Sequence, residues 1–171
     1  MMGNRRTSTG EAATKLVLTM FRANGLLLDA GDLLGTDEGL TSARWQVLGA
    51  IALAERPLTV PQIARRMGLT RQSVHATVNR LVRDGLLQLS PNMDHRRSPL
   101  VCLTASGKAK YEAIDARQAV WINRLTRGLG RADIETAERV LVELCRRLEA
   151  EGEDRSQTAQ EEGSVRRHRG P

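Results

Sequence analysis

The feature that most constrains this sequence is the segment LTRQSVHATVNRLVRDG at residues 69–85, which has one apolar and one polar face at helical spacing. Its apolar residues recur at the i, i+4, i+7 and i+8 spacing of an amphipathic helix: Val74, Val78, Leu81 and Val82. The opposite face carries arginine, glutamine, histidine and asparagine, and Asp84 is the one acid in the segment. A helix over 71–84 therefore has an apolar side to bury and a cationic side to expose.

Turn signals on either side of this segment divide the region into two helices. A shorter helix ends near Met67 and carries Pro61 in its first turn, where a missing N–H is tolerated. A tight turn at residues 68–70 follows, and the Thr70 hydroxyl can cap the second helix, which Gly85 terminates. The pattern predicts a helix, a tight turn and a second helix.

The sequence changes to short β-prone runs after the second helix. LLQLS and PLVCLT flank the turn-rich stretch PNMDHRRSP, whose two prolines disfavour helix. This arrangement predicts a β-hairpin with a long basic tip. Together with the two preceding helices, the hairpin predicts a winged helix-turn-helix.

Further helices flank this region. Apolar residues recur at helical intervals in four more segments: 11–34, about 42–54, about 105–128 and about 132–150. Thr41 or Ser42 can cap the second of these segments, and Thr104 can cap the third. The apolar faces of the first and last segments exceed what one small winged-helix domain can cover, which favours a dimer.

Positive charge is concentrated in the middle of the chain. The formal net charge is +6, and residues 58–104 hold seven arginines against two acids. A localised basic surface indicates a polyanionic partner, either a nucleic acid or an anionic membrane surface. An ordinary solvated surface is the alternative, in which Arg80 and Asp84 simply form an i,i+4 pair worth about 0.2–0.5 kcal/mol.

Composition and patterning together set the expected fold and its divisions. Aromatic residues make up only 2% of the 171 residues, so aliphatic side chains must fill the interior, which favours helices. We expect a mainly α fold with a small β-hairpin wing (α+β), a winged helix-turn-helix whose terminal helices form a dimerisation domain. The expected divisions are a disordered N-terminus at 1–10, dimerisation helices at 11–40 and 105–150, a DNA-binding domain at 41–104, and a disordered tail at 151–171.

A winged helix-turn-helix reads DNA with the exposed side of its second helix and with its wing. The helix enters the major groove, and arginines beside it hold phosphates. The wing tip can reach the minor groove or clamp phosphates beside it, and Asp94 is expected to orient Arg96 or Arg97. The predicted DNA-binding residues are Thr70, Arg71, Gln72, Ser73, His75, Ala76, Asn79, Arg80, Arg96 and Arg97.

The chain resembles the MarR family of bacterial transcriptional regulators over about residues 12–150. Three blocks carry the resemblance: LTSARWQVLGAI, LTVPQIARRMGLTRQSVHATVNRLVRDGLL and HRRSPLVCLTASGKA. Their order and spacing match the helix before the DNA-binding domain, the helix-turn-helix, and the wing running into the next helix. The wing departs from the pattern, because many members carry Asp-x-Arg-Asp-x-Arg where this chain has NMDHRR.

The resemblance implies a homodimer that binds a pseudo-palindromic operator, with a repressor as the expected role. Many relatives respond to small aromatic molecules bound between the dimerisation helices and the DNA-binding lobe. In this chain the residues expected to line such a pocket are Met20, Phe21, Asn24, Trp45 and Tyr111. The alternative is that these five are ordinary core and interface side chains.

Other functional classes find little support in the sequence. No phosphate-binding glycine loop, metal-ligand pair or nucleophile with a base is present, so we expect neither an enzyme nor a cofactor or metal. Cys102 and Cys145 are expected to be buried hydrophobes in a cytoplasmic protein with no membrane association. A winged-helix protein that binds DNA architecturally, without choosing an operator, is the second hypothesis. The operator, the effector and any redox role of the cysteines are left open.

Overall fold

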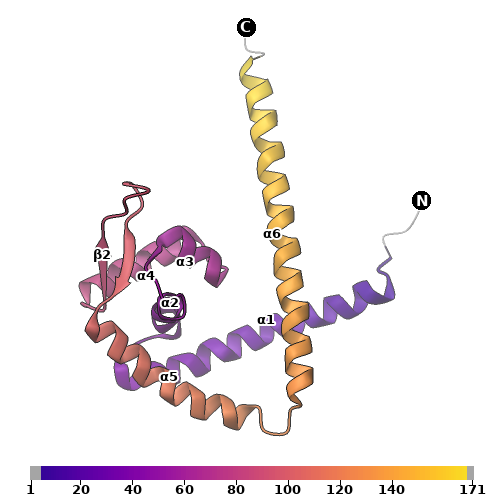
Figure 1. Ribbon diagram of the computed structural model, residues 1–171. Helices are drawn as coiled ribbons and strands as arrows, with labels where there is room; N and C mark the ends of the chain where they lie inside the picture. The colour runs from indigo at the N-terminus through magenta and orange to yellow at the C-terminus, as the bar shows by residue number, and fades with distance from the viewer. Residues whose placement is uncertain (1–4, 169–171) are drawn as a thin grey trace. The chain divides into compact units, whose positions relative to one another are not determined.

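The computed structural model describes the backbone of residues 5–168 and the side chains of residues 5–152. The chain divides into two units, Met1–Ile122 and Asn123–Pro171. Its elements, shown in Figure 1, are α1 (Ser8–Gly35), η1 (Thr36–Glu38), α2 (Ser42–Ala52), β1 (Leu58–Thr59), α3 (Val60–Met67), α4 (Arg71–Arg83), β2 (Leu87–Ser90), β3 (Leu100–Leu103), α5 (Ala105–Leu125) and α6 (Arg131–His168). The predicted mainly helical fold with a hairpin wing is confirmed.

The core of the first unit lies among α2, α3, α4 and the sheet. Leu48 of α2, Ile63 of α3, Val74 and Leu81 of α4, and Val101 of β3 have no exposed surface. Burial of a side chain of this size contributes about 1.5–3 kcal/mol. The apolar face predicted for residues 71–84 is therefore the face that holds α4 on the domain.

Capping residues bound the two central helices; the caps at Thr70 and Gly85 were predicted, and the one at Thr59 was not. The side chain of Thr59 accepts from the Gln62 N–H and the Gln62 side chain accepts from the Thr59 N–H, which forms a capping box at the start of α3. The Thr70 hydroxyl accepts from the Ser73 N–H at 3.1 Å. Gly85 follows α4 with a φ of 71°, a backbone conformation that glycine adopts without strain.

The N-terminus of α2 is capped by a carboxylate from α1 and not by its own residues. Thr41 has the extended backbone of a capping residue, but its side chain makes no capping hydrogen bond. The Ser42 N–H instead donates to Oδ1 of Asp32. A carboxylate complements the positive end of the helix dipole. The predicted side-chain cap at Thr41 or Ser42 is wrong, because the carboxylate of Asp32, ten residues upstream, accepts from the Ser42 N–H instead.

The wing belongs to a three-stranded antiparallel sheet with strand order β1-β3-β2. The predicted hairpin pairs Leu87 with Leu103 and Ser90 with Leu100. The strand β1 pairs Leu58 with Val101 on the other side of β3. This strand was not predicted, because two residues are too few to show the alternating pattern of a strand.

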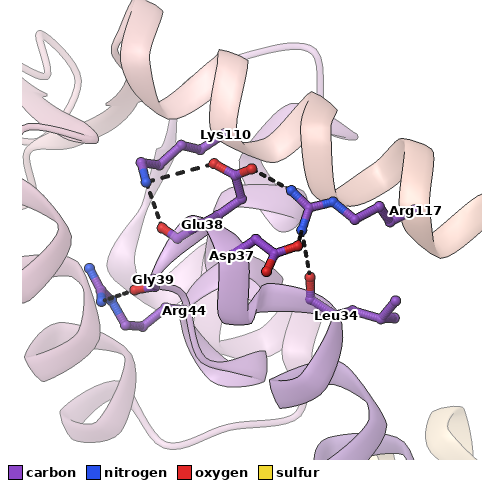
Figure 2. A network of polar contacts seen from close by, with 7 residues as sticks. All are labelled: Leu34, Asp37, Glu38, Gly39, Arg44, Lys110 and Arg117. Carbon is purple, nitrogen blue, oxygen red and sulfur yellow. Dashed lines mark hydrogen bonds and ion pairs between the residues drawn. The ribbon is translucent and has the colours of Figure 1, made fainter.

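A charged network, shown in Figure 2, ties the connection between α1 and α2 to α5. Arg117 donates to Oδ2 of Asp37 at 2.9 Å, to the carbonyl of Leu34 at 3.4 Å and to the carboxylate of Glu38. Lys110, two turns earlier on α5, donates to the backbone carbonyl of Glu38. These contacts hold η1 against α5, although the two segments lie more than 70 residues apart in sequence.

The terminal helices leave large apolar side chains exposed. Phe21 is 70% exposed and Leu33 is 79% exposed, while only Gly31 and Gly35 of α1 are buried. The other large apolar residues exposed on these helices include Leu18, Leu26, Val120, Leu125, Val140, Val142 and Leu148. Contiguous apolar surface is uncommon on a monomer and marks an interaction site.

The second unit consists mainly of α6, which continues past the expected end near residue 150. Its backbone is helical to His168, so the structure differs from the disorder expected for residues 151–168. That segment is rich in glutamate, glutamine and arginine, which favour helix, and it contains no proline. Residues 169–171 of the expected tail lie outside the described residues. Arg146 and Arg147 hydrogen-bond Glu143 and lower the pKa of its carboxyl to about 2.

The observed start of α1 and the observed end of α5 each differ by a few residues from the sequence prediction. The helix α1 begins at Ser8, inside the segment expected to be disordered, because the Thr7 hydroxyl accepts from the Gly10 N–H at 3.0 Å. Residues 1–4 of that segment lie outside the described residues. The helix α5 ends at Leu125, before Gly128, whose φ is 87°.

Both cysteines are free thiols, and neither is fully buried in the chain. Cys102 is half-buried and its Sγ lies 3.4 Å from Oγ of Ser90. Cys145 is exposed on α6. The expectation that both are buried hydrophobes is therefore wrong for the single chain.

We predict that Gly107→Ala destabilises the first unit. A Cβ at this position would lie 2.0 Å from the carbonyl oxygen of Leu86, and that oxygen already accepts from the Thr104 N–H. Overpacking of this kind costs about 1–3 kcal/mol. Thermal unfolding followed by circular dichroism should show a lower midpoint. Gly25→Ala, whose Cβ would meet nothing within 4 Å, is the control and should not lower it; equal midpoints for the two variants would contradict the prediction.

Candidate nucleic-acid interface

The helices α3 and α4 form the helix-turn-helix, joined by the turn at residues 68–70. One side of α4 is fixed by the burial of Val74, Val78 and Leu81. Because these buried residues recur at the helical period, the opposite side of α4 stays exposed. Within α4 and its cap, all the residues predicted to contact DNA are exposed: Thr70, Arg71, Gln72, Ser73, His75, Ala76, Asn79 and Arg80.

His75 and Asn79 form a pair on the exposed side of α4. Nδ2 of Asn79 lies 3.3 Å from Nδ1 of His75, one helical turn away. An amide N–H donates, so Nδ1 of the ring accepts and its Nε2 carries the proton. The pair therefore presents an N–H from His75 and an amide oxygen from Asn79 to its surroundings.

A groove between α4 and the wing gathers the predicted residues from two elements. Arg71, Gln72, His75 and Asn79 line it from α4, and Arg97 lines it from the wing. Val60 and Pro61 at the start of α3 also line it. Arg96 is exposed but is not among the lining residues. The fold thus brings Arg97 close to the exposed face of α4, which lies about twenty residues earlier in sequence.

The wing tip is braced by an asparagine. Nδ2 of Asn92 donates to the carbonyl of Ser98 at 2.9 Å, and its Oδ1 accepts from the Asp94 N–H at 3.1 Å. No ion pair joins Asp94 to Arg96 or Arg97 in the part of the chain that the structure describes. The predicted role of Asp94 in orienting an arginine is therefore wrong, and the side chain of Asn92 holds the wing tip instead. The signal for that brace is the known tendency of asparagine to bond the backbone two residues ahead.

Most of the basic charge in this region is not neutralised by the chain itself. Arg80 is the exception, with its Nε 3.5 Å from Oδ2 of Asp84 in an i,i+4 pair. Arg44 of α2 binds the same carboxylate. The other six arginines between residues 58 and 104 have no carboxylate partner among the described residues: Arg65, Arg66, Arg71, Arg83, Arg96 and Arg97.

A second concave region lies between α2, α3 and α5 and includes two of the five residues predicted to bind a ligand. Trp45 and Tyr111 line it, together with Arg66, Asp115 and Gln118. The hydroxyl of Tyr111 donates to Oδ1 of Asp115 at 3.3 Å. Burial, and then the nearby Asp115 carboxylate, raise the pKa of the tyrosine hydroxyl, so it remains protonated and able to donate. The indole nitrogen of Trp45 is buried without a hydrogen-bond partner among the described residues.

The other three predicted ligand residues do not line this cavity. Met20, Phe21 and Asn24 lie on α1, and none is among the lining residues. Gly31 of α1 lies beside the tryptophan, because a Cβ added there would lie 3.4 Å from the indole nitrogen of Trp45. Met20 is eleven residues away along the helix, about 16 Å at 1.5 Å per residue. Their role in ligand binding stays a prediction.

Four residues near these sites were not predicted from the sequence: Arg44, Arg66, Asp115 and Gln118. Arg44 meets Asp84 and Arg66 lines the second cavity only because the helices pack together, which no local pattern indicates. No group of three or more potential metal ligands occurs among the described side chains. None of the described helices has the long apolar stretch that a bilayer crossing requires.

The chain is similar to known proteins over most of its length. A family profile described as "MarR family" matches residues 38–98. An uncharacterised protein of Mycobacterium tuberculosis is 42% identical over 137 residues, which make up 80% of this chain and 94% of that protein. The transcriptional activatory protein BadR of Rhodopseudomonas palustris is 30% identical over 123 residues, or 67% of this chain and 70% of BadR.

Solved structures with low sequence identity share the fold. The regulator MOSR of Mycobacterium tuberculosis, in complex with DNA, has a TM-score of 0.65 at 24% identity and covers 78% of this chain and 96% of its own. CouR of Rhodococcus jostii, bound to p-coumaroyl-CoA, has a TM-score of 0.69 at 20% identity. The match covers 76% of this chain and 91% of CouR.

We predict that Asn92→Ala loosens the wing tip. The variant removes the acceptor of the Asp94 N–H and the donor to the carbonyl of Ser98. A hydrogen bond worth about 0.5–1.5 kcal/mol corresponds to roughly 2- to 10-fold faster amide exchange at Asp94. Amide hydrogen exchange followed by NMR measures this rate. Met93→Ala, at a side chain that is 93% exposed, should leave it unchanged; an unaltered Asp94 rate in Asn92→Ala would show that the brace is not formed.

Proposed function

Because the chain belongs to the MarR family, we propose that it is a homodimeric transcriptional regulator that binds a pseudo-palindromic DNA operator and is released by a small aromatic ligand. One observation carries the proposal. The polar side of α4 is exposed, carries Arg71 and Arg83 without a carboxylate partner among the described residues, and shares a groove with Arg97 of the wing. A cationic helix with one free face matches the shape and charge of the major groove.

In this proposal His75 and Asn79 read base edges. The Nε2–H of the histidine suits an acceptor such as N7 or O6 of guanine, and the asparagine amide suits the acceptor and donor that adenine presents. Ser73 and Ala76 lie on the same exposed side and complete the reading surface. Each good base contact contributes about 1–3 kcal/mol of discrimination against the wrong base.

The arginines around this surface bind the DNA backbone. Thr70, Arg71, Gln72 and Arg80 flank the reading residues at the two ends of α4 and are exposed. Contacts of this kind fix the position of the helix without selecting a sequence. Arg96 and Arg97 of the wing reach the minor groove or the phosphates beside it, where the negative potential attracts guanidinium groups.

Dimerisation through the terminal helices supplies the second half of the reading surface. Each of α1, α5 and α6 carries large apolar side chains that the single chain leaves exposed, including Phe21, Val120 and Val142. A two-fold dimer presents two recognition helices about 34 Å apart, one turn of DNA. The operator of such a dimer is pseudo-palindromic.

The cavity that contains Trp45 and Tyr111 is the proposed ligand site. Its aromatic side chains provide stacking surfaces, while Arg66 and Gln118 provide polar groups. CouR, which shares the fold, is bound to p-coumaroyl-CoA, a ligand with an aromatic acyl group. A ligand between α3 and α5 changes DNA binding only if it favours one spacing of the recognition helices over the other.

Repression in the cytoplasm is the proposed outcome of DNA binding. A dimer seated on a promoter excludes the polymerase, whereas the relative BadR is named for activation. The position of the operator relative to the promoter decides between these effects, and footprinting on the promoter identifies it.

Architectural binding is the competing function. It predicts little preference for any one sequence over random duplex, whereas an operator-binding protein should bind its operator about 10³-fold or more tighter than random duplex.

We predict separable effects of the helix and wing residues on DNA binding. A preferred duplex is first selected from a random library with the wild-type protein. His75→Ala and Asn79→Ala should reduce the preference for that duplex over random DNA, because they remove base contacts. Arg97→Ala should weaken both alike and reduce the slope of log affinity against log salt by about 0.9 per half-site. Unchanged preference in both helix variants would exclude base reading by this pair.

We predict that Val142→Glu abolishes dimerisation. The side chain is 61% exposed in the single chain, so the folded unit tolerates the charge while an apolar interface does not. Sedimentation velocity should show a monomer at concentrations where the wild type is a dimer. Leu53→Glu, at a side chain that is 70% exposed outside the terminal helices, is the matched control and should remain dimeric. A dimeric Val142→Glu protein would place the interface elsewhere.

A further inference from the structure

The C-terminal end of the recognition helix holds one carboxylate between two arginines. Asp84 follows α4 directly as its capping residue. Arg44, from α2, binds Oδ2 of this carboxylate closely, whereas Nε of Arg80 lies 3.5 Å from the same oxygen. That distance is longer than an ordinary N–H···O hydrogen bond. Arg80 is therefore held only loosely.

Arg44 itself is fixed and cannot leave this position easily. Its second terminal nitrogen donates to the carbonyl of Gly39 at 3.0 Å, in the connection that the α5 network of Figure 2 holds in place. Its side chain is only 19% exposed. In contrast, the side chain of Arg80 is 62% exposed on the DNA-facing helix. Arg44 is thus a structural partner of Asp84, and Arg80 is the partner that can reach DNA.

The two arginines compete for one negative charge. With Arg44 in place the three groups carry a net charge of +1, and the carboxylate already has a close donor. Without Arg44, Asp84 has Arg80 as its remaining partner, and the charges of that pair cancel. A neutralised Arg80 is a poor ligand for a phosphate, because it must first break its contact with Asp84.

We propose that Arg44 is a positioning residue for DNA binding, which occupies the carboxylate of Asp84 so that Arg80 of α4 is free to bind a DNA phosphate. The proposal rests on the proposed function, since it requires α4 to lie against DNA. Arg44 does not touch DNA in this scheme. Its effect passes through Asp84 and Arg80.

The experiment measures the affinity of full-length variants for the selected duplex as a function of salt. Arg44→Gln should weaken binding about tenfold and reduce the salt slope by roughly 2, as expected when a dimer loses one phosphate contact per chain. Adding Asp84→Asn to Arg44→Gln should restore affinity and slope to near wild-type values, since Arg80 is then released. A purely structural bridge between α2 and α4 predicts no restoration.

A second comparison separates this path from a general effect of charge. In an Arg80→Gln background, Arg44→Gln should cause no further loss, whereas a long-range charge effect would weaken binding again. Arg56→Gln removes the same charge from an exposed position and should retain wild-type affinity. Circular dichroism and sedimentation verify the fold and the assembly of each variant.

The outcomes distinguish this inference from the proposed function. A wild-type protein that enriches no duplex contradicts both. A wild type that binds, with Arg44→Gln indistinguishable from it or with the double variant as weak as Arg44→Gln, overturns the inference alone. If Arg44→Gln fails to fold, Asp84→Asn decides: it should bind at least as tightly as the wild type, and weaker binding overturns the inference.

Discussion

The burial of three aliphatic side chains on one side of α4 is the constraint on which the rest of the structure depends. Val74, Val78 and Leu81 have at most 1% of their surface exposed. Because they recur at the helical period, fixing them fixes the rotation of the helix. The arginines, His75 and Asn79 must then face outward.

Tertiary contacts convert this oriented helix into a shaped surface. The sheet places the wing beside α4, so that Arg97 shares a groove with Asn79, and Asn92 closes the wing tip. At the other end of α4, the carboxylate of Asp84 joins the helix to Arg44 of α2. The exposed face of α4 is thus fixed by contacts with α2 at one end and shares a groove with the wing.

Much of this arrangement was predictable from local sequence. The caps at Thr70 and Gly85, the hairpin and the outward residues of α4 follow from periodicity and turn chemistry over a few positions. Two of the errors have different causes. Asp32 replaced the expected cap of α2 because the packing of α1 brings its carboxylate to the Ser42 N–H, whereas Asn92 braces the wing tip through local hydrogen bonds that asparagine commonly makes.

The sequence by itself determined the helical periods, the helix-turn-helix order, the excess of positive charge and the family to which the chain belongs. Only the tertiary structure decided which charges are paired. Arg44 of α2 binds the carboxylate of Asp84 closely and leaves Arg80 loosely held at 3.5 Å from the same oxygen, while Arg71 and Arg97 have no carboxylate partner among the described residues. The physical reason is that a helical period acts over four residues, whereas an ion pair such as Arg44 with Asp84 joins residues 40 positions apart, and its existence depends on how the helices pack.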